Sequence, residues 1–281
     1  MLGKLIAYEF RGLWRPVLIV LLIMAVAGVA GTLSCNAIEV VSDYYGGLKV
    51  GASDVAGDVA IALVLFTLFS GFVVWAGVIA LFIVVVSRFY RTMFTDQGYL
   101  TLTLPVSTAA LVLAKYLAAF ILMLAGVVLA IAVYSAMLTT IMGEYGPSAT
   151  TVILAMLGGS FGFFNDAEPV AAVAGTVNTV ISIGYQLGLA WLALALGAWW
   201  AKRHKMAAAV GIFLGVGWLV SLAFSIADVI ALTTGGYSYG WGMANLATGA
   251  VSVVRMVSFI LAAVGCVALS VFVVRRKVDL S

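Results

Sequence analysis

Residues whose types could carry chemistry are few in this chain. His204 is the only histidine, and it lies in a basic turn where we expect a solvated loop residue rather than a general base or a ligand. The sequence contains no G-x-x-x-x-G-K-[ST] phosphate loop and no H-E-x-x-H zinc motif. Cys35 and Cys266 fall in different apolar runs and predict neither a disulfide nor a metal site. We therefore expect no catalytic residue, no metal and no nucleotide site here, and binding is the chemistry to look for.

One polar stretch, Ser87–Ser107, stands out between long apolar runs. Its apolar side chains have helical spacing and its polar side chains fill the positions between, which predicts an amphipathic helix. Gly98 is placed to end that helix, and Ser107 or Thr108 can cap the next one. The apolar members are Phe89, Tyr90, Met93 and Phe94, and the polar members are Arg88, Arg91, Thr92, Thr95 and Asp96. Such a helix either docks a partner protein or lies solvated on the headgroups.

A second polar pattern lies inside an apolar run. Asn178, Ser182 and Gln186 recur every four residues, which places them on one face of a helix. Each polar side chain is costly in lipid, so the pattern needs an explanation. One interpretation is hydrogen bonding between packed helices, and the other is the lining of a substrate path.

The elements that position these residues are set by composition. The chain has 281 residues, of which 65% are hydrophobic and only 9% are charged, with a mean hydropathy of +1.22. A soluble domain would carry about a quarter charged residues. The apolar runs are long and do not alternate, so they predict helices rather than strands of a barrel. We therefore expect an all-α integral membrane protein that forms a single transmembrane domain over residues 1–281.

We expect six spans, joined by polar segments of different kinds. Residues 1–15 predict an amphipathic interfacial helix, residues 87–107 a cytoplasmic loop with a coupling helix between spans two and three, and residues 143–169 and 228–250 extracellular segments. Lys115, about two turns into the third span, is expected to extend back to the interface. The spans lie near residues 17–34, 60–86, 109–142, 171–201, 206–227 and 251–274.

Charge asymmetry orients the spans. Of the 14 basic residues, only Lys49 and Arg255 fall on the side opposite the termini. Because basic residues favour the cytoplasmic side, the sequence predicts both termini in the cytoplasm. Most acidic residues, among them Glu39, Asp43 and Asp58, fall on the other side.

The polar stretch resembles a known loop. Residues 88–107, with Lys115 following, are similar to the segment between the second and third spans of type 2 ABC-transporter permeases. The similarity covers about a tenth of the chain. It departs from the family pattern at Gln97, where a second acidic residue is usual. The shared residues are Asp96, Gly98, Tyr99, Leu100, Thr101, Thr103, Leu104, Pro105, Val106, Ser107 and Lys115.

This resemblance implies a permease subunit of an ATP-driven transporter, usually an exporter, in a bacterial plasma membrane. It further implies that ATP and Mg are bound by a separate cytoplasmic ATPase, that a second permease chain, identical or related, completes the transporter, and that no nucleic acid is involved. Asp96 is then the expected charge contact with the ATPase. The expected coupling residues are Arg88, Phe89, Tyr90, Arg91, Met93, Phe94, Asp96 and Gly98, with Glu9 and Arg11 as additions to the same surface.

Two alternatives stay open at this point. The apolar face of the polar stretch could rest on the protein's own spans instead of on an ATPase. The whole chain could also be an ATPase-independent carrier or a membrane scaffold. A carrier coupled to protons or ions would be expected to hold an ionisable group near the centre of a span, and no span centre carries one.

Overall fold

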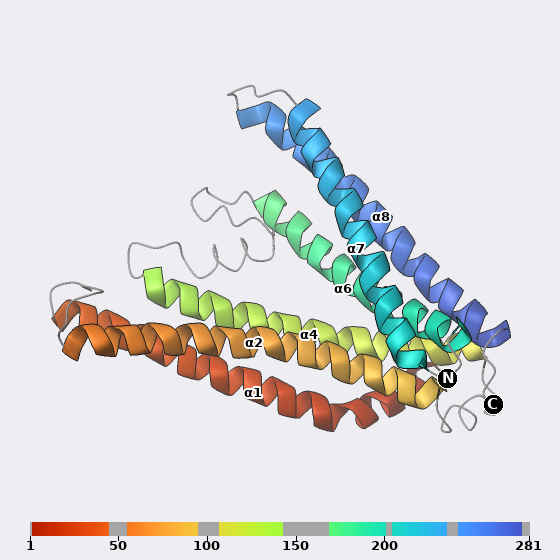
Figure 1. Cartoon of the computed structure of the whole chain (residues 1–281), viewed down its shortest axis with the longest axis horizontal. Helices are drawn as coiled ribbons and strands as arrows, with labels where there is room; N and C mark the ends of the chain where they lie inside the picture. Colours follow the sequence, from red (N-terminus) through yellow and green to blue (C-terminus); the bar gives the residue numbers. More distant parts are fainter. Residues whose placement is uncertain are drawn as a thin grey trace. The chain divides into compact units, whose positions relative to one another are not determined.

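The structure is a computed structural model, and it describes residues 2–44, 55–94, 107–142, 169–200, 204–234 and 241–276. Over these ranges every residue is helical except Ser107 and His204. Within these ranges, six helices are long and apolar enough to cross a membrane, which confirms the predicted all-α class and agrees with six candidate spans. The helices are α1 (Leu2–Tyr44), α2 (Val55–Phe94), α4 (Thr108–Met142), α6 (Pro169–Trp200), α7 (Lys205–Thr234) and α8 (Trp241–Arg276) (Figure 1).

The helices are longer than the predicted spans. A bilayer core needs about 20 helical residues, whereas α1 has 43 and α2 has 40. Pro16 lies inside α1, so the expected interfacial helix and first span are one continuous helix. Ser87–Phe94 likewise forms the last two turns of α2 rather than a separate helix. Continuing a helix keeps its backbone groups hydrogen-bonded. α1 continues through Pro16, which lacks a backbone N–H, and α2 meets no such helix breaker where the polar stretch begins.

The predicted polar connections are only partly covered. Most of residues 228–250, expected as an outer segment, belongs to the end of α7 and the start of α8. The segment 143–168 lies outside the described residues, as do 95–106. Of the two predicted caps, Ser107 is the one that caps α4, because its Oγ accepts a hydrogen bond from the Ala110 N–H at 3.3 Å.

The chain divides into two compact units. One of them contains residues 10–85 and 121–179, and its core is formed by α1, α2 and α4. Small residues let these helices approach closely, since a Cβ added at Gly28 would overlap Val133 and one at Gly77 would overlap Met24. Hydrogen bonds join the same helices: the Ser34 and Thr67 hydroxyls lie 2.7 Å apart, and the Tyr134 hydroxyl donates to the Gly71 carbonyl at 2.6 Å.

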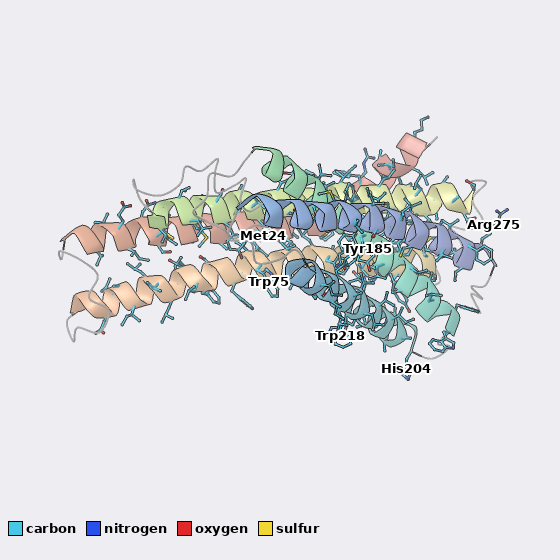
Figure 2. The ribbon with its side chains drawn as sticks, turned by 90° about the horizontal axis from the view of Figure 1, so that it is seen from above. Met24, Trp75, Tyr185, His204, Trp218 and Arg275 are labelled. Carbon is cyan, nitrogen blue, oxygen red and sulfur yellow. The ribbon has the colours of Figure 1, made fainter. Side chains whose placement is uncertain are left out.

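The other unit contains residues 1–9, 86–120 and 180–281. Here α6 is the central helix, since Leu187, Trp191 and Ala195 are at most 1% exposed, whereas most described residues of α7 are exposed. Gly188 of α6 faces the backbone of α8 at Ala263, and α7 packs on α8. Trp218 lies on the outer side of α7 and is 65% exposed (Figure 2). This unit carries the end of α2, where the polar stretch begins, and the start of α4, where it ends. It also carries the C-terminal part of α6.

Candidate functional site

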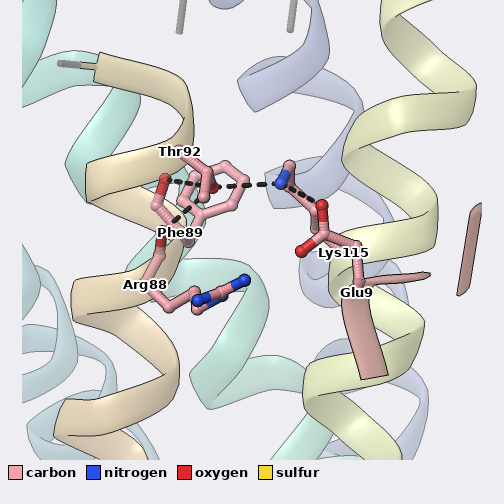
Figure 3. Close-up of polar contacts among 5 residues, drawn as sticks. All are labelled: Glu9, Arg88, Phe89, Thr92 and Lys115. Atoms are coloured by element: carbon pink, nitrogen blue, oxygen red, sulfur yellow. Dashed lines mark hydrogen bonds and ion pairs between the residues drawn. The ribbon is translucent and has the colours of Figure 1, made fainter. Parts of the chain in front are cut away.

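A buried polar cluster lies where the start of α1, the end of α2 and the start of α4 meet. The Lys115 Nζ of α4 forms an ion pair with the Glu9 Oε1 of α1 and donates a hydrogen bond to the Thr92 Oγ1 of α2 at 3.0 Å (Figure 3). Thr92 Oγ1 in turn donates to the Arg88 carbonyl at 2.9 Å. Three helices that are distant in sequence are therefore joined through one ammonium group.

The cluster is shielded from the surroundings. The Lys115 side chain is 4% exposed and the Glu9 side chain 12%. The expectation that Lys115 extends back to the interface is therefore wrong, because a carboxylate within the fold compensates its charge instead. Removing one member of a buried pair leaves the other charge uncompensated, at a cost of about 3–5 kcal/mol. The two residues therefore depend on each other.

Aromatic side chains pack beside this cluster. Phe89 stacks on Trp191 of α6 with ring centroids 4.3 Å apart, and Tyr116 of α4 meets the same indole edge-on at 6.2 Å. The Tyr116 hydroxyl also donates to the Gly184 carbonyl at 2.8 Å. The end of α2 is thus packed on α6 through the Phe89 and Trp191 rings, and it is joined to α4 through the hydrogen bond from Lys115 to Thr92.

The apolar coupling residues are mostly covered by the chain itself. Phe89, Met93 and Phe94 are at most 5% exposed. Tyr90 is half-buried, and its ring centroid lies 6.1 Å from that of Phe94. Of the two interpretations left open for this face, the structure shows contact with the protein's own helices, and a contact with an ATPase stays a prediction.

The polar members of the stretch differ in exposure. Arg91 is exposed, and so is Arg11 on α1, whereas Arg88 is half-buried with a buried Nε that has no hydrogen-bond partner. Asp96 and Gly98 lie outside the described residues. Glu9, which the sequence placed on the same surface as Arg11, is instead turned into the cluster.

The predicted path-lining residues of α6 fall in both compact units. Asn178 is half-buried, and its Oδ1 is buried without a hydrogen-bond partner. In the unit that contains residues 180–281, Ser182 is half-buried and Gln186 is exposed. The adjacent Tyr185 is 4% exposed and stacks on Phe259 of α8 at 4.9 Å. Gln186 is therefore turned outward in this unit, while the neighbouring Tyr185 is covered.

Sequence reasoning missed the Glu9–Lys115 pair and the role of Trp191. A signal for the pair was present: a lysine eight residues into an apolar helix needs an acid, and only Glu9, Asp96 and Asp279 lie on the predicted cytoplasmic side. Trp191 had no such signal, because α6 is apolar over most of its length. No group of three or more potential metal ligands occurs within the part of the chain that the structure describes.

Comparison with known proteins identifies no relative: no protein-family model, no curated protein and no solved structure matches the chain. The fold and the site defined by these residues are those of a multi-pass helical membrane protein with a buried ion pair at one end of its helices.

Proposed function

We propose that this chain is the transmembrane permease subunit of an ATP-driven ABC transporter, an exporter by its resemblance. We further propose that residues 88–107 couple it to a separate ATPase. The supporting observation is the anchoring of the end of α2. Its last turns, which begin the polar stretch, are packed on Trp191 and hydrogen-bonded to Lys115. Because the end of α2 is anchored in this way, a displacement of the loop that follows it can be transmitted into α2.

The mechanism follows from that anchoring. The partner ATPase would bind ATP and Mg, and its ATP-driven closure would act on the loop around Asp96. Because the loop joins α2 and α4 directly, a displacement of the loop acts on two spans at once. Packed interfaces between helices switch between discrete arrangements rather than deforming continuously, which suits a two-state transport cycle.

The remaining parts of the proposal concern the membrane and the path. We place the chain in a bacterial plasma membrane with both termini in the cytoplasm, on the basis of the resemblance and the charge asymmetry. Gln186 and Asn178 are proposed to face a path completed by a second permease chain. The exposure of Gln186 inside a candidate span supports this, since an amide facing lipid is unfavourable.

The first experiment is a mild-detergent purification of the tagged full-length chain from its own host. We expect a soluble P-loop ATPase in near-equal amount, and ATP hydrolysis by that complex should fall with Asp96→Ala. Asp279→Ala is the matched control, because it removes another expected cytoplasmic carboxylate outside the loop. Recovery of the chain alone, under conditions that preserve a known transporter complex, would remove the ATPase from the proposal.

An ATPase-independent carrier is the second candidate function. The observation that favours it is the Glu9–Lys115 pair, an ionisable pair within two candidate spans. Each member is the eighth residue of its helix, about 10 Å from the helix start, which is not a central position. The same purification separates the candidates, because a carrier needs no ATPase.

A further inference from the structure

We propose that Glu9, Lys115 and Thr92 form a positioning clasp that ties both flanks of the coupling loop to α1, so that movement of the loop is transmitted to the N-terminal helix. This inference rests on the proposed function for the source of the movement, but the clasp itself is a property of the chain.

The first step is the position of the residues around the loop. Thr92 lies two residues before α2 ends at Phe94, and Lys115 is the eighth residue of α4. Residues 95–106 run between these two helices. The Lys115–Thr92 hydrogen bond of 3.0 Å therefore joins the chain on either side of the loop.

The second step is the charge that extends the clasp to α1. Lys115 is 4% exposed and its ion-pair partner Glu9 is 106 residues away in the sequence. Moving α4 and the end of α2 without α1 would separate two buried charges, and each would then lack compensation. The start of α1 must accordingly follow the flanks of the loop.

The third step is the use of the Thr92 hydroxyl in both directions. It accepts from Lys115 and donates to the Arg88 carbonyl one turn earlier, at 2.9 Å. A valine has nearly the same shape but can do neither, whereas a serine can do both. Thr92→Val and Thr92→Ser are therefore a matched pair for testing the clasp without introducing an unpaired charge.

The purified permease alone gives the first measurement. Nitroxide labels are attached at Tyr8→Cys on α1 and Arg91→Cys on α2, two exposed positions, with Cys35 and Cys266 replaced. We expect a narrow distance distribution in the parent and with Thr92→Ser. With Thr92→Val, and more strongly with Lys115→Met, the distribution should broaden or shift. Unchanged distributions in both variants would overturn the clasp, whether or not an ATPase exists.

The ATPase complex gives the second measurement. Thr92→Val should lower permease-stimulated ATP hydrolysis by about fivefold or more, because a hydrogen bond from a charged group is lost, while Thr92→Ser keeps it. The double variant Glu9→Gln with Lys115→Met should recover the thermal midpoint lost in each single variant, but it should not recover the stimulation.

These outcomes separate the possible failures. Full stimulation in Thr92→Val, or in the double variant, would mean that the cluster only stabilises the fold and would overturn the transmission role. Absence of any co-purifying ATPase would contradict the proposed function, and the distance measurement would still decide whether α1 and α2 are clasped.

Discussion

At the scale of single residues, burial rather than residue type decides what a side chain contributes. α6 carries three tryptophans, Trp191, Trp199 and Trp200, that the sequence does not distinguish. Trp191 is 1% exposed and contacts the rings of Phe89 and Tyr116, whereas Trp200 is 81% exposed. Buried aromatic pairs add about 0.5–1.5 kcal/mol beyond the area that they bury. Trp191 is therefore expected to hold the end of α2, and Trp200 is not.

We predict that Trp191→Ala destabilises the protein by about 3–5 kcal/mol, the usual cost of truncating a buried Trp. The measurement is the thermal midpoint of the purified protein in detergent. Trp200→Ala, in the same helix, should leave the midpoint close to that of the parent. Equal midpoints for the two variants would contradict the packing of Trp191 that the structure shows.

At the scale of elements, helix contacts in the unit of α1, α2 and α4 depend on small side chains. Gly28 of α1 faces Val133 of α4, and an added Cβ would overlap both methyl groups of the valine. Val133 is β-branched and has little rotamer freedom in a helix, so it cannot turn aside easily. By contrast, nothing lies within 4 Å of a Cβ added at Gly211 of α7. The two glycines have different structural roles.

We predict that Gly28→Ala destabilises the protein by about 1–3 kcal/mol, because overpacking forces the two helices apart. Gly211→Ala is the matched control and should be neutral or slightly stabilising, since alanine is the better helix former. Thermal midpoints of both variants, measured side by side, test this. A neutral Gly28→Ala would show that α1 and α4 can separate at this point without cost.

At the scale of the whole molecule, the surfaces left open by the chain matter most. Much of the apolar surface is exposed, including Trp218 and Leu219 on α7, as expected for helices that face lipid or a second chain. Gln186 differs from these side chains, because it is an exposed amide near the middle of a candidate span, whereas the exposed amide of Asn36 lies near the end of its span. If water reaches Gln186, the residue lines a path, and if another protein surface covers Gln186, the residue has a packing role.

We predict that Gln186→Cys, in a background without Cys35 and Cys266, reacts with a membrane-impermeant polar thiol reagent in intact membranes. Leu189→Cys is the control, since Leu189 is 2% exposed in the same helix and should stay protected. Asn178→Cys is expected to react more slowly than Gln186→Cys, because Asn178 is half-buried. Protection of Gln186→Cys in every nucleotide state would favour a packing role over the path.

Much of the architecture could be predicted from the sequence, because it depends on local properties. The all-α class and the six spans follow from runs of apolar residues, since lipid requires each backbone group to find its partner within the helix. The cap at Ser107 was likewise a local feature. The lengths of α1 and α2 were predicted less well. Pro16 suggested a break inside α1, and the polarity of Ser87–Phe94 suggested that α2 ends earlier, but both helices continue.

The tertiary structure alone decided which residues meet. The sequence by itself determined that Lys115 lies in an apolar helix and therefore needs compensation, but not that Glu9 supplies it from 106 residues away. It also determined that Phe89 and Met93 share an apolar face, but not that Trp191 of α6 covers Phe89. The hydrophobic effect has no direction. A sequence pattern therefore shows that a side chain must be buried, and only the packing of distant helices shows which residues cover it.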